Sequence, residues 1–208
     1  MTKIVTLLSD FGLQDPYAGV MKGVIFRHCP DCQVVDLTHL IPPQNIWLGA
    51  IQLERAVPHF PVGTVHLAVV DPGVGGPRKP IMVESERHRF VGPDNGVFSL
   101  VFARERVTRV WEIDTDRFDA SRVSATFHGR DIFAPVAARV RLGGPGGSLG
   151  RESCARVGLE KLEPEVSEGT INARVIAVDH FGNLVSNLSQ DLFMRLAGSR
   201  PFRIAVGG

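Results

Sequence analysis

The sequence has little of what several classes of protein require. Its lysines and arginines form no basic run, its formal net charge is +1, and it contains only one tyrosine and two tryptophans. Binding of nucleic acid needs a basic surface and usually aromatic stacking platforms, so we expect no nucleic-acid partner. No apolar stretch reaches membrane-spanning length, so we expect no membrane partner. The N-terminus enters a strand-like run without a signal-peptide pattern, which predicts a cytoplasmic protein.

What is present is typical of a folded globular chain. Hydrophobic residues make up 44% of the sequence and charged residues 22%, close to ordinary usage, which argues against disorder. A length of 208 residues is enough to bury a full core. It allows one domain, or one domain with a smaller appendage.

Cysteine is scarce, and two of the three cysteines lie close together as Cys29-Pro30-Asp31-Cys32. The pair is compatible with a redox site or with half of a zinc site. A zinc site needs further ligands at suitable spacing, and the remaining cysteine, Cys154, is solitary. We therefore favour a turn after a helix, with Pro30 and Asp31 supplying the turn chemistry.

The most informative stretch is VHLAVVDPGVGG at 65–76, an apolar run that stops at Asp71 before a glycine-rich loop. Such a run is typical of a strand buried on both faces of a parallel sheet, and ligands bind beyond the carboxyl ends of such strands. Two other apolar runs end similarly, at Asp10 and at Asp179. One such ending is compatible with a plain turn. Three of them predict carboxylates gathered at one edge of a sheet.

Strand and helix patterns alternate in the first part of the chain, which predicts parallel pairing with helical crossovers. Asp15 followed by Pro16 predicts the N-cap and first residue of a helix, and Asn45 predicts the cap of a second helix. Strands are expected at 4–10, 33–39, 65–70, 80–84, 88–92 and 107–113, and a further helix after His128.

The fold class indicated is α/β, with an N-terminal α/β domain and a mainly parallel sheet at 1–142. A glycine-rich stretch then opens a linker at 143–169. The segment 170–208 shows only β-like patterns and forms a partial C-terminal β domain. So short a segment cannot close a stable β domain alone, so we expect it to pack on the first domain or on a partner chain.

Five short motifs, each weak alone, occur together in one order. In this combination the chain resembles the S-adenosylmethionine hydroxide adenosyltransferases, relatives of the fluorinase and the chlorinase, over almost all of its length. The motifs are SDFG at 9–12, VDPGVG at 70–75, GPDNG at 92–96, FHGRD at 127–131 and DHFGN at 179–183.

The resemblance implies an α/β domain followed by a β-barrel-type domain, in a homotrimer whose substrate lies between neighbouring subunits. Family members usually continue beyond the position of Gly208, so the resemblance also implies a truncated barrel. This leaves two interpretations open. The first is an active enzyme, and the second is a homologue that binds adenosine or S-adenosylmethionine without turnover.

The reaction implied is hydrolysis of S-adenosylmethionine to adenosine and L-methionine by attack of water at the ribose C5′. Its catalytic set falls on Asp71, Arg78 and His128. A sulfonium is an excellent leaving group, so the missing ingredient is a positioned and partly deprotonated water. Asp71 and His128 would hold that water and take its proton, while Arg78 keeps the acid ionised. We expect no cofactor and no metal.

Four further residues would bind the substrate by the same resemblance. Asp10 would accept bonds from the ribose hydroxyls and Asp179 would pair with the methionine ammonium. Phe181 would stack on adenine and Asn183 would read its edge. The alternative for Asp10 and Asp179 is a turn at the end of a strand, and for Phe181 a place in the core.

Two competing chemistries are compared at the same residues. The fluorinase has tyrosine at the position of Asp71 and Tyr-Ser at the position of His128-Gly129. A carboxylate here would repel a halide by several kcal/mol where water is excluded, so water is the fitting nucleophile. A metal-dependent phosphohydrolase built on Asp10, Asp71 and His128 is a further alternative.

Overall fold

The computed structural model describes residues 3–117, 123–154, 156–160 and 163–207. The chain divides into two compact units, Met1–Leu159 and Glu160–Gly208. The division falls inside the segment 143–169 for which we predicted a linker. That segment also contains regular structure, since strand β7 (Gly150–Glu152) belongs to the first unit and strand β8 (Glu165–Ser167) to the second.

The first unit is built on one mixed sheet of seven strands in the order β2-β1-β3-β5-β4-β6-β7. Neighbours from β2 to β5 pair in parallel, whereas β4, β6 and β7 pair antiparallel. The strands besides β7 are β1 (Lys3–Ser9), β2 (Cys32–Thr38), β3 (Val65–Val69), β4 (Pro80–Ser85), β5 (Arg89–Pro93) and β6 (Val107–Ile113).

The parallel part of the sheet agrees with the expectation from sequence, and the antiparallel part is an addition. A short turn after Ser85 joins β4 to β5 directly, and Ser85 N donates to His88 O at 2.9 Å. A connection of this length can only reverse the chain, because a parallel pair needs a crossover of a dozen or more residues. Length therefore decides the orientation of this hairpin.

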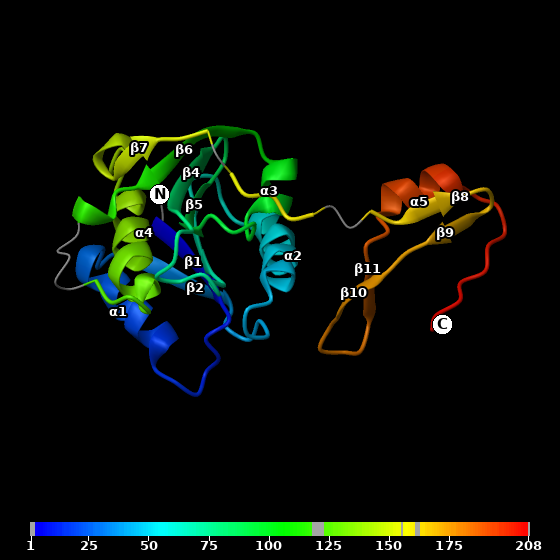
Figure 1. Ribbon diagram of the computed structural model, residues 1–208, viewed down its shortest axis with the longest axis horizontal. Coiled ribbons are helices and arrows are strands. Elements are labelled where there is room, and N and C mark those ends of the chain that lie inside the picture. Colours follow the sequence, from blue (N-terminus) through cyan, green and yellow to red (C-terminus); the bar gives the residue numbers. More distant parts are fainter. Residues whose placement is uncertain (1–2, 118–122, 155, 161–162, 208) are drawn as a thin grey trace. The chain divides into compact units, whose positions relative to one another are not determined.

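Helices cover both faces of the sheet, as Figure 1 shows. Helices α1 (Tyr17–His28) and α4 (Ala134–Arg141) pack on one face, and α2 (Ile46–Ala56) and α3 (Ser99–Arg104) on the other. Short 3₁₀ turns lie at Val57–His59, Thr115–Arg117 and Gly146–Ser148, and a π-helical turn, Gly129–Phe133, leads into α4.

The two faces have separate hydrophobic cores. Side chains alternate along a strand, so Leu7 of β1 packs beneath α1 and α4 while Leu8 packs beneath α2 and α3. All five residues of β3 are buried. The apolar run before Asp71 is therefore the centre of the unit, covered on both faces as its sequence predicts.

The two predicted helix caps have different outcomes. Asn45 is the N-cap of α2, since its side chain accepts from Leu48 N at 2.9 Å. The prediction for Asp15 is wrong. Helix α1 begins at Tyr17, one residue later than predicted, with Pro16 in the cap position and no capping bond from a side chain.

The second unit contains two hairpins and a helix. Strand β8 pairs with β9 (Thr170–Asn172), and β10 (Val175–Val178) pairs with β11 (Leu184–Ser186). Helix α5 (Gln190–Leu196) follows, capped by Ser189, which accepts from Leu192 N at 3.2 Å. The expectation of a purely β-like segment is therefore wrong at α5. The hairpins form two separate small sheets, and a barrel is not shown.

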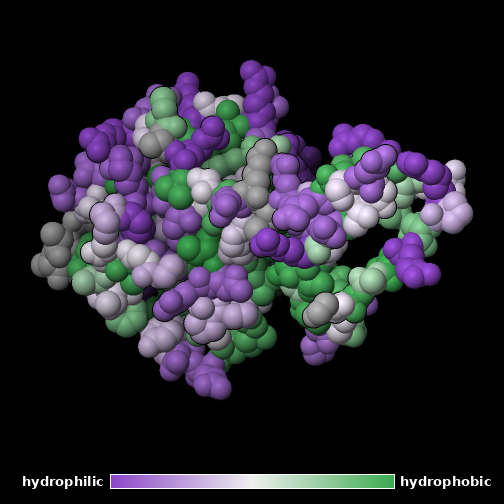
Figure 2. Space-filling model, turned by 45° about the vertical axis from the view of Figure 1, so that its right-hand side comes forward, coloured by the Kyte–Doolittle hydropathy of each residue, from purple (hydrophilic) through white to green (hydrophobic). Residues whose placement is uncertain are grey.

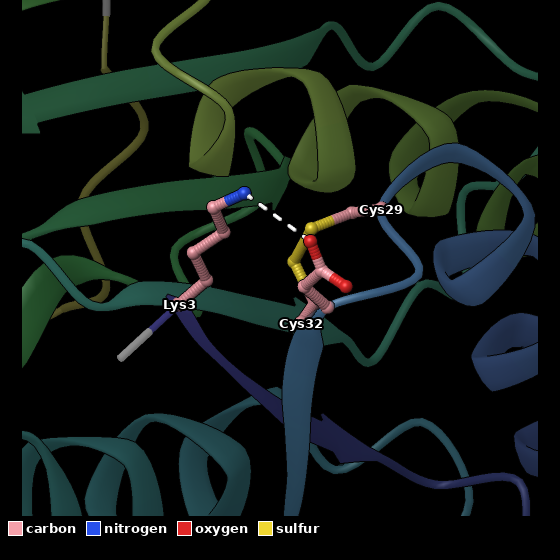
Figure 3. Close-up of a disulfide and its surroundings, with 4 residues drawn as sticks. Lys3, Cys29 and Cys32 are labelled. Carbon is pink, nitrogen blue, oxygen red and sulfur yellow. Dashed lines mark ion pairs between the residues drawn. A yellow bond between two sulfur atoms is a disulfide. The ribbon is translucent and has the colours of Figure 1, made fainter. Parts of the chain in front are cut away.

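Cys29 and Cys32 form a disulfide between the end of α1 and the start of β2, drawn in Figure 3 beside Lys3. Both cysteines are buried, and Cys32 N donates to Cys29 O at 3.0 Å. The predicted turn after a helix is present, and the structure adds a covalent bond across it. Lys3 Nζ lies 4.0 Å from the Asp31 carboxylate at the tip of this turn.

The surface carries many hydrophilic side chains on the face drawn in Figure 2, with hydrophobic groups between them. Within the described residues, every helix is too short or too polar to cross a bilayer.

A buried histidine lies on the face of the sheet that α2 and α3 cover. His66 of β3 is fully buried. Its Nδ1 shares a hydrogen bond with Thr6 Oγ1 at 2.8 Å, and its ring stacks on Phe90. Burial and then the neighbouring His88 lower the pKa of His66 to about 3. His66 is therefore neutral in the folded protein over the whole range in which an exposed histidine takes up a proton.

This lowered pKa predicts loss of stability in mild acid. The unfolded chain binds a proton at His66 below about pH 6.5 and the folded chain does not, so the free energy of unfolding falls by about 1.4 kcal/mol per pH unit between about pH 6 and 4. Urea unfolding of the parent and of His66→Asn across this range measures the effect. The variant should have the shallower slope, and equal slopes would contradict the assignment.

Candidate active site

Asp71 stands where the central strand leaves the sheet. Strand β3 ends at Val69, and the next carbonyl, Val70 O, accepts from the Asn95 side chain at 2.7 Å. Asn95 Oδ1 also accepts from Val97 N at 3.2 Å. Asn95 thus ties the end of β3 to the loop after β5 and fixes the backbone immediately before Asp71.

Arg78 holds the Asp71 carboxylate with both arms of its guanidinium group. Arg78 Nε donates to Oδ1 at 3.0 Å and to Oδ2 at 2.9 Å, and Nη2 donates to Oδ2 at 2.5 Å. The side chains of Arg78 and Asp71 are only 9% and 5% exposed. The guanidinium carbon also lies 5.3 Å from the centre of the Phe133 ring. This is a largely buried ion pair, in which each charge depends on its partner.

The same Arg78 nitrogen that binds Asp71 also reaches His128. Arg78 Nη2 lies 2.7 Å from His128 Nδ1. A guanidinium has no acceptor, so Nδ1 must be the acceptor and the ring must be neutral, with its proton on Nε2. Burial and then Arg78 lower the pKa of His128 below its usual value, and outweigh the opposing effects of Asp71 and Asp131.

Two loops meet at these residues because Gly75 allows a close approach. Its φ is 74°, and a Cβ there would lie 2.4 Å from Ala125 O. Asp131 closes the second loop by accepting from Ser124 N at 2.8 Å and from the Arg130 side chain. The loop of Asp71 and Arg78 is thereby held against the loop of His128.

Beside the ion pair lies a cavity of about 530 Å³. Phe11 and Phe127 flank Tyr17, with ring centres 6.1 Å and 5.7 Å from the tyrosine ring. Two carboxylates, an arginine and two hydroxyls supply the polar groups. The lining residues are Asp10, Phe11, Pro16, Tyr17, Val20, Met21, Val69, Asp71, Val74, Thr126, Phe127, Gly129 and Arg130. An apolar cavity with a few polar groups is typical of a small-molecule site.

Asp10 lies in this cavity directly after β1, the neighbour of β3. Its Oδ2 accepts from Gln44 N at 2.8 Å. The sequence prediction that Asp10 and Asp71 share one edge of the sheet is therefore confirmed, since both follow adjacent parallel strands.

The predicted third carboxylate, Asp179, is not part of this sheet. It lies in the turn between β10 and β11 of the second unit, where Oδ1 accepts from Phe181 N at 2.9 Å and from Asn183 N at 2.8 Å. Gly182 completes the turn with a φ of 87°. The expectation that three acids gather at one sheet edge is wrong for Asp179.

The other two predicted residues of the second unit lie beside Asp179. Asn183 donates from its side chain to Asp179 Oδ2 at 2.7 Å. Phe181 is 87% exposed, which excludes a place in the core of this unit. The structure thus gathers Asp179, Phe181 and Asn183 at one hairpin turn, and Asp71, Arg78 and His128 in the first unit.

Sequence reasoning did not single out Asn95, Tyr17, Phe127 and Arg130 as parts of a site. Asn95, Phe127 and Arg130 occur in the quoted motifs GPDNG and FHGRD, so the signal was present. Tyr17 follows Asp15-Pro16, where only a helix was predicted. Over the described residues, no three His, Cys, Asp or Glu side chains form a group suited to a metal ion.

Comparison with known proteins places this geometry in context. Residues 5–150 match the family described as SAM hydroxide adenosyltransferase N-terminal domain. A relative from Thermus thermophilus, named (R)-S-adenosyl-L-methionine hydrolase, is 41% identical over 98% of this chain and 83% of its own length. A fluorinase from Actinopolyspora mzabensis is more distant, at 24% identity over 90% of this chain and 72% of its own.

A solved structure is similar to this chain in both fold and sequence. The crystal structure of a conserved protein from Thermotoga maritima superposes with a TM-score of 0.87 and 39% sequence identity, covering 93% of this chain and 74% of that one. The match in sequence covers more than half of the chain, and the solved structure shares its fold. The chain therefore belongs to the SAM hydroxide adenosyltransferase family.

Proposed function

We propose that the protein hydrolyses S-adenosylmethionine to adenosine and L-methionine. The observation that carries this proposal is the buried arrangement of Asp71, Arg78 and His128 at the edge of an apolar cavity. The relative from Thermus thermophilus and others of similar identity are named (R)-S-adenosyl-L-methionine hydrolase. The cavity offers room for a nucleoside, and the ion pair offers a fixed carboxylate to a water molecule.

The reaction is a displacement at carbon with water as the nucleophile. The water oxygen bonds to the ribose C5′ while the C5′–S bond breaks, and its electron pair leaves with methionine as a neutral thioether. The proton of the water passes to Asp71 and then to solvent. Oδ2 of Asp71 accepts two bonds from Arg78, whereas Oδ1 accepts one and retains a second lone pair that can accept from water.

Arg78 and His128 have separate roles in this mechanism. Arg78 holds the carboxylate in one orientation, and its planar fork does so more rigidly than a lysine would. His128 Nδ1 is occupied by Arg78, so the histidine offers Nε2–H to the water and orients it by donation. Asp71 is then the group that accepts the proton, a narrower assignment than sequence alone allowed.

The substrate would be recognised by the residues that the resemblance implies. Asp10 faces the cavity and would accept from the ribose hydroxyls, beside the aromatic side chains of Tyr17 and Phe127. Asp179, Phe181 and Asn183 would bind the methionine ammonium and the adenine. Their clustering at one exposed turn supports a shared role.

The carboxylate of Asp71 favours water over a halide as the nucleophile. A halide approaching the cavity meets the Asp71 carboxylate, whose side chain is 5% exposed and therefore poorly screened by solvent. We propose further that the reaction needs no cofactor, and that the protein acts in the cytoplasm as a homotrimer.

Turnover itself is the first test. Purified protein incubated with S-adenosylmethionine should release adenosine, measured by chromatography. Asp71→Asn should reduce the rate by about two to four orders of magnitude, because it removes the acceptor of the proton. The affinity for adenosine, measured by calorimetry, should change little. Binding of adenosine without any product from the parent protein would instead support a homologue that binds without turnover.

The rate should depend on pH through His128. Protonation places N–H against the Arg78 guanidinium, so the rate should fall as pH drops, along a limb centred below about 6.5 because the pKa of His128 is lowered. His128→Asn offers Arg78 a non-titrating acceptor and should abolish this limb. Arg78→Lys should reduce the rate and keep the limb. The same limb in the parent and in His128→Asn would remove His128 from the mechanism.

Assembly is tested separately. Apolar side chains of the second unit are exposed, among them Phe181 at 87%, Ile204 at 73% and Val206 at 67%. Exposed apolar patches of this kind mark contact surfaces, and the family resemblance implies that the assembly is a homotrimer. Light scattering at micromolar concentration should give three times the chain mass of 22.7 kDa. A uniform monomer would contradict the proposal.

A further inference from the structure

A chain of hydrogen bonds runs from the surface of α1 to the loop that carries Asp10. Lys22 Nζ donates to Asp36 Oδ2 at 2.5 Å, and Asp36 Oδ1 lies 3.1 Å from His39 Nε2. His39 Nδ1 lies 2.7 Å from Ser9 Oγ, which in turn accepts from Phe11 N at 3.3 Å. The chain thus ends on the two residues that flank Asp10.

The bonds at Asp36 have a fixed direction. Burial works to raise the pKa of Asp36, but hydrogen bonds from Lys22 and His39 prevail and lower it. An ionised Asp36 only accepts, so His39 Nε2 carries a proton and donates it. Ser9 Oγ accepts from Phe11 N and is also bonded to His39 Nδ1, so its oxygen joins the histidine to the backbone beyond Asp10. Lys22, Asp36, His39 and Ser9 thus each have a hydrogen-bond partner in this network.

The arrangement has the composition of a Ser-His-Asp triad, but it cannot act as one. Ser9 and His39 are 0% and 3% exposed, so no substrate carbonyl can reach the hydroxyl. Ser9 also uses its oxygen to hold Phe11 N. This chain of hydrogen bonds therefore orders the backbone around it, since buried and fully satisfied polar networks rigidify a structure.

The segment that begins at His39 holds the same loop at two more points. His39 O accepts from Gly12 N at 2.7 Å, and Gln44 N donates to the Asp10 carboxylate at 2.8 Å. Among the described residues, Gln44 is the one non-glycine residue with a positive φ, 67°. Backbone strain of this kind is typical of functional sites. Three separate contacts thus make residues 39–44 a support for residues 9–12.

We propose that His39 is a positioning residue that, through Ser9, holds the loop of Asp10 and Phe11 in the orientation that binds the nucleoside. This inference rests on the proposed function, because it takes adenosine as the ligand of that loop. His39 and Ser9 touch no reacting atom, so they determine affinity for the nucleoside and leave the chemistry at Asp71 unchanged.

Variants along the chain test this role. Ser9→Ala removes the hydroxyl alone, and His39→Ala removes the ring. Each should weaken adenosine binding and raise KM for S-adenosylmethionine by about ten-fold, the contribution of roughly one hydrogen bond. The kcat should change much less. His39→Asn keeps a hydrogen-bonding group near the position of Nδ1 and should recover most of the lost affinity.

The protein offers a matched control variant on the same strand, β1. Thr6 of β1 bonds the buried His66 at 2.8 Å, but it points to the opposite face of the sheet from Ser9. Thr6→Val therefore removes a comparable buried hydroxyl and should leave adenosine affinity unchanged. In an Asp10→Asn background, Ser9→Ala should cost less affinity than in the parent, because the two residues act on one contact.

The outcomes separate this inference from the proposed function. A parent protein that binds and cleaves S-adenosylmethionine, with Ser9→Ala and His39→Ala matching it in Kd and KM, would overturn the role of His39 alone. A lower melting temperature with unchanged Kd would reduce the chain to a structural support. A parent that binds neither S-adenosylmethionine nor adenosine would overturn the proposed function itself.

Discussion

The geometry of the candidate site depends on one guanidinium group shared between two partners. Arg78 binds both oxygens of Asp71 and also donates to His128, in a setting where its side chain is only 9% exposed. A buried charge without its partner is costly, by about 3–5 kcal/mol, so each residue maintains the position of the others. Burial and then the Arg78 cation lower the pKa of His128.

The fold brings this group together by means of loops at the end of a parallel sheet. Asp71 and Arg78 lie in the loop after strand β3, and His128 stands immediately before the π-helical turn that leads into α4. Gly75 lets two of these loops touch where any side chain would collide with Ala125 O. Asn95 fixes the backbone before Asp71 from a third loop. The precision of the site therefore comes from contacts between loops that are far apart in sequence.

A second set of contacts supports the neighbouring strand end in the same manner. Ser9, His39 and Gln44 secure the residues around Asp10, with a strained backbone at Gln44 as part of the arrangement. The two carboxylates of the cavity thus have separate supports, one built on a buried ion pair and one on the hydrogen bonds of Ser9, His39 and Gln44. This separation agrees with different roles for them, since Asp71 would meet the nucleophile and Asp10 the ribose.

The sequence by itself determined the parallel start of the sheet, the cap at Asn45 and the placement of Asp10 and Asp71 at strand ends on one edge of the sheet, because these follow from local periodicity and turn chemistry. It also carried the family motifs. Only the tertiary structure decided the order of the strands in the sheet, the helix α5, and the position of Asp179 in a separate hairpin. It alone showed that Arg78 occupies His128 Nδ1, and that His39 reaches Ser9. The reason is physical: these contacts join residues thirty to fifty positions apart, and local propensity contains no information on which distant side chains will meet.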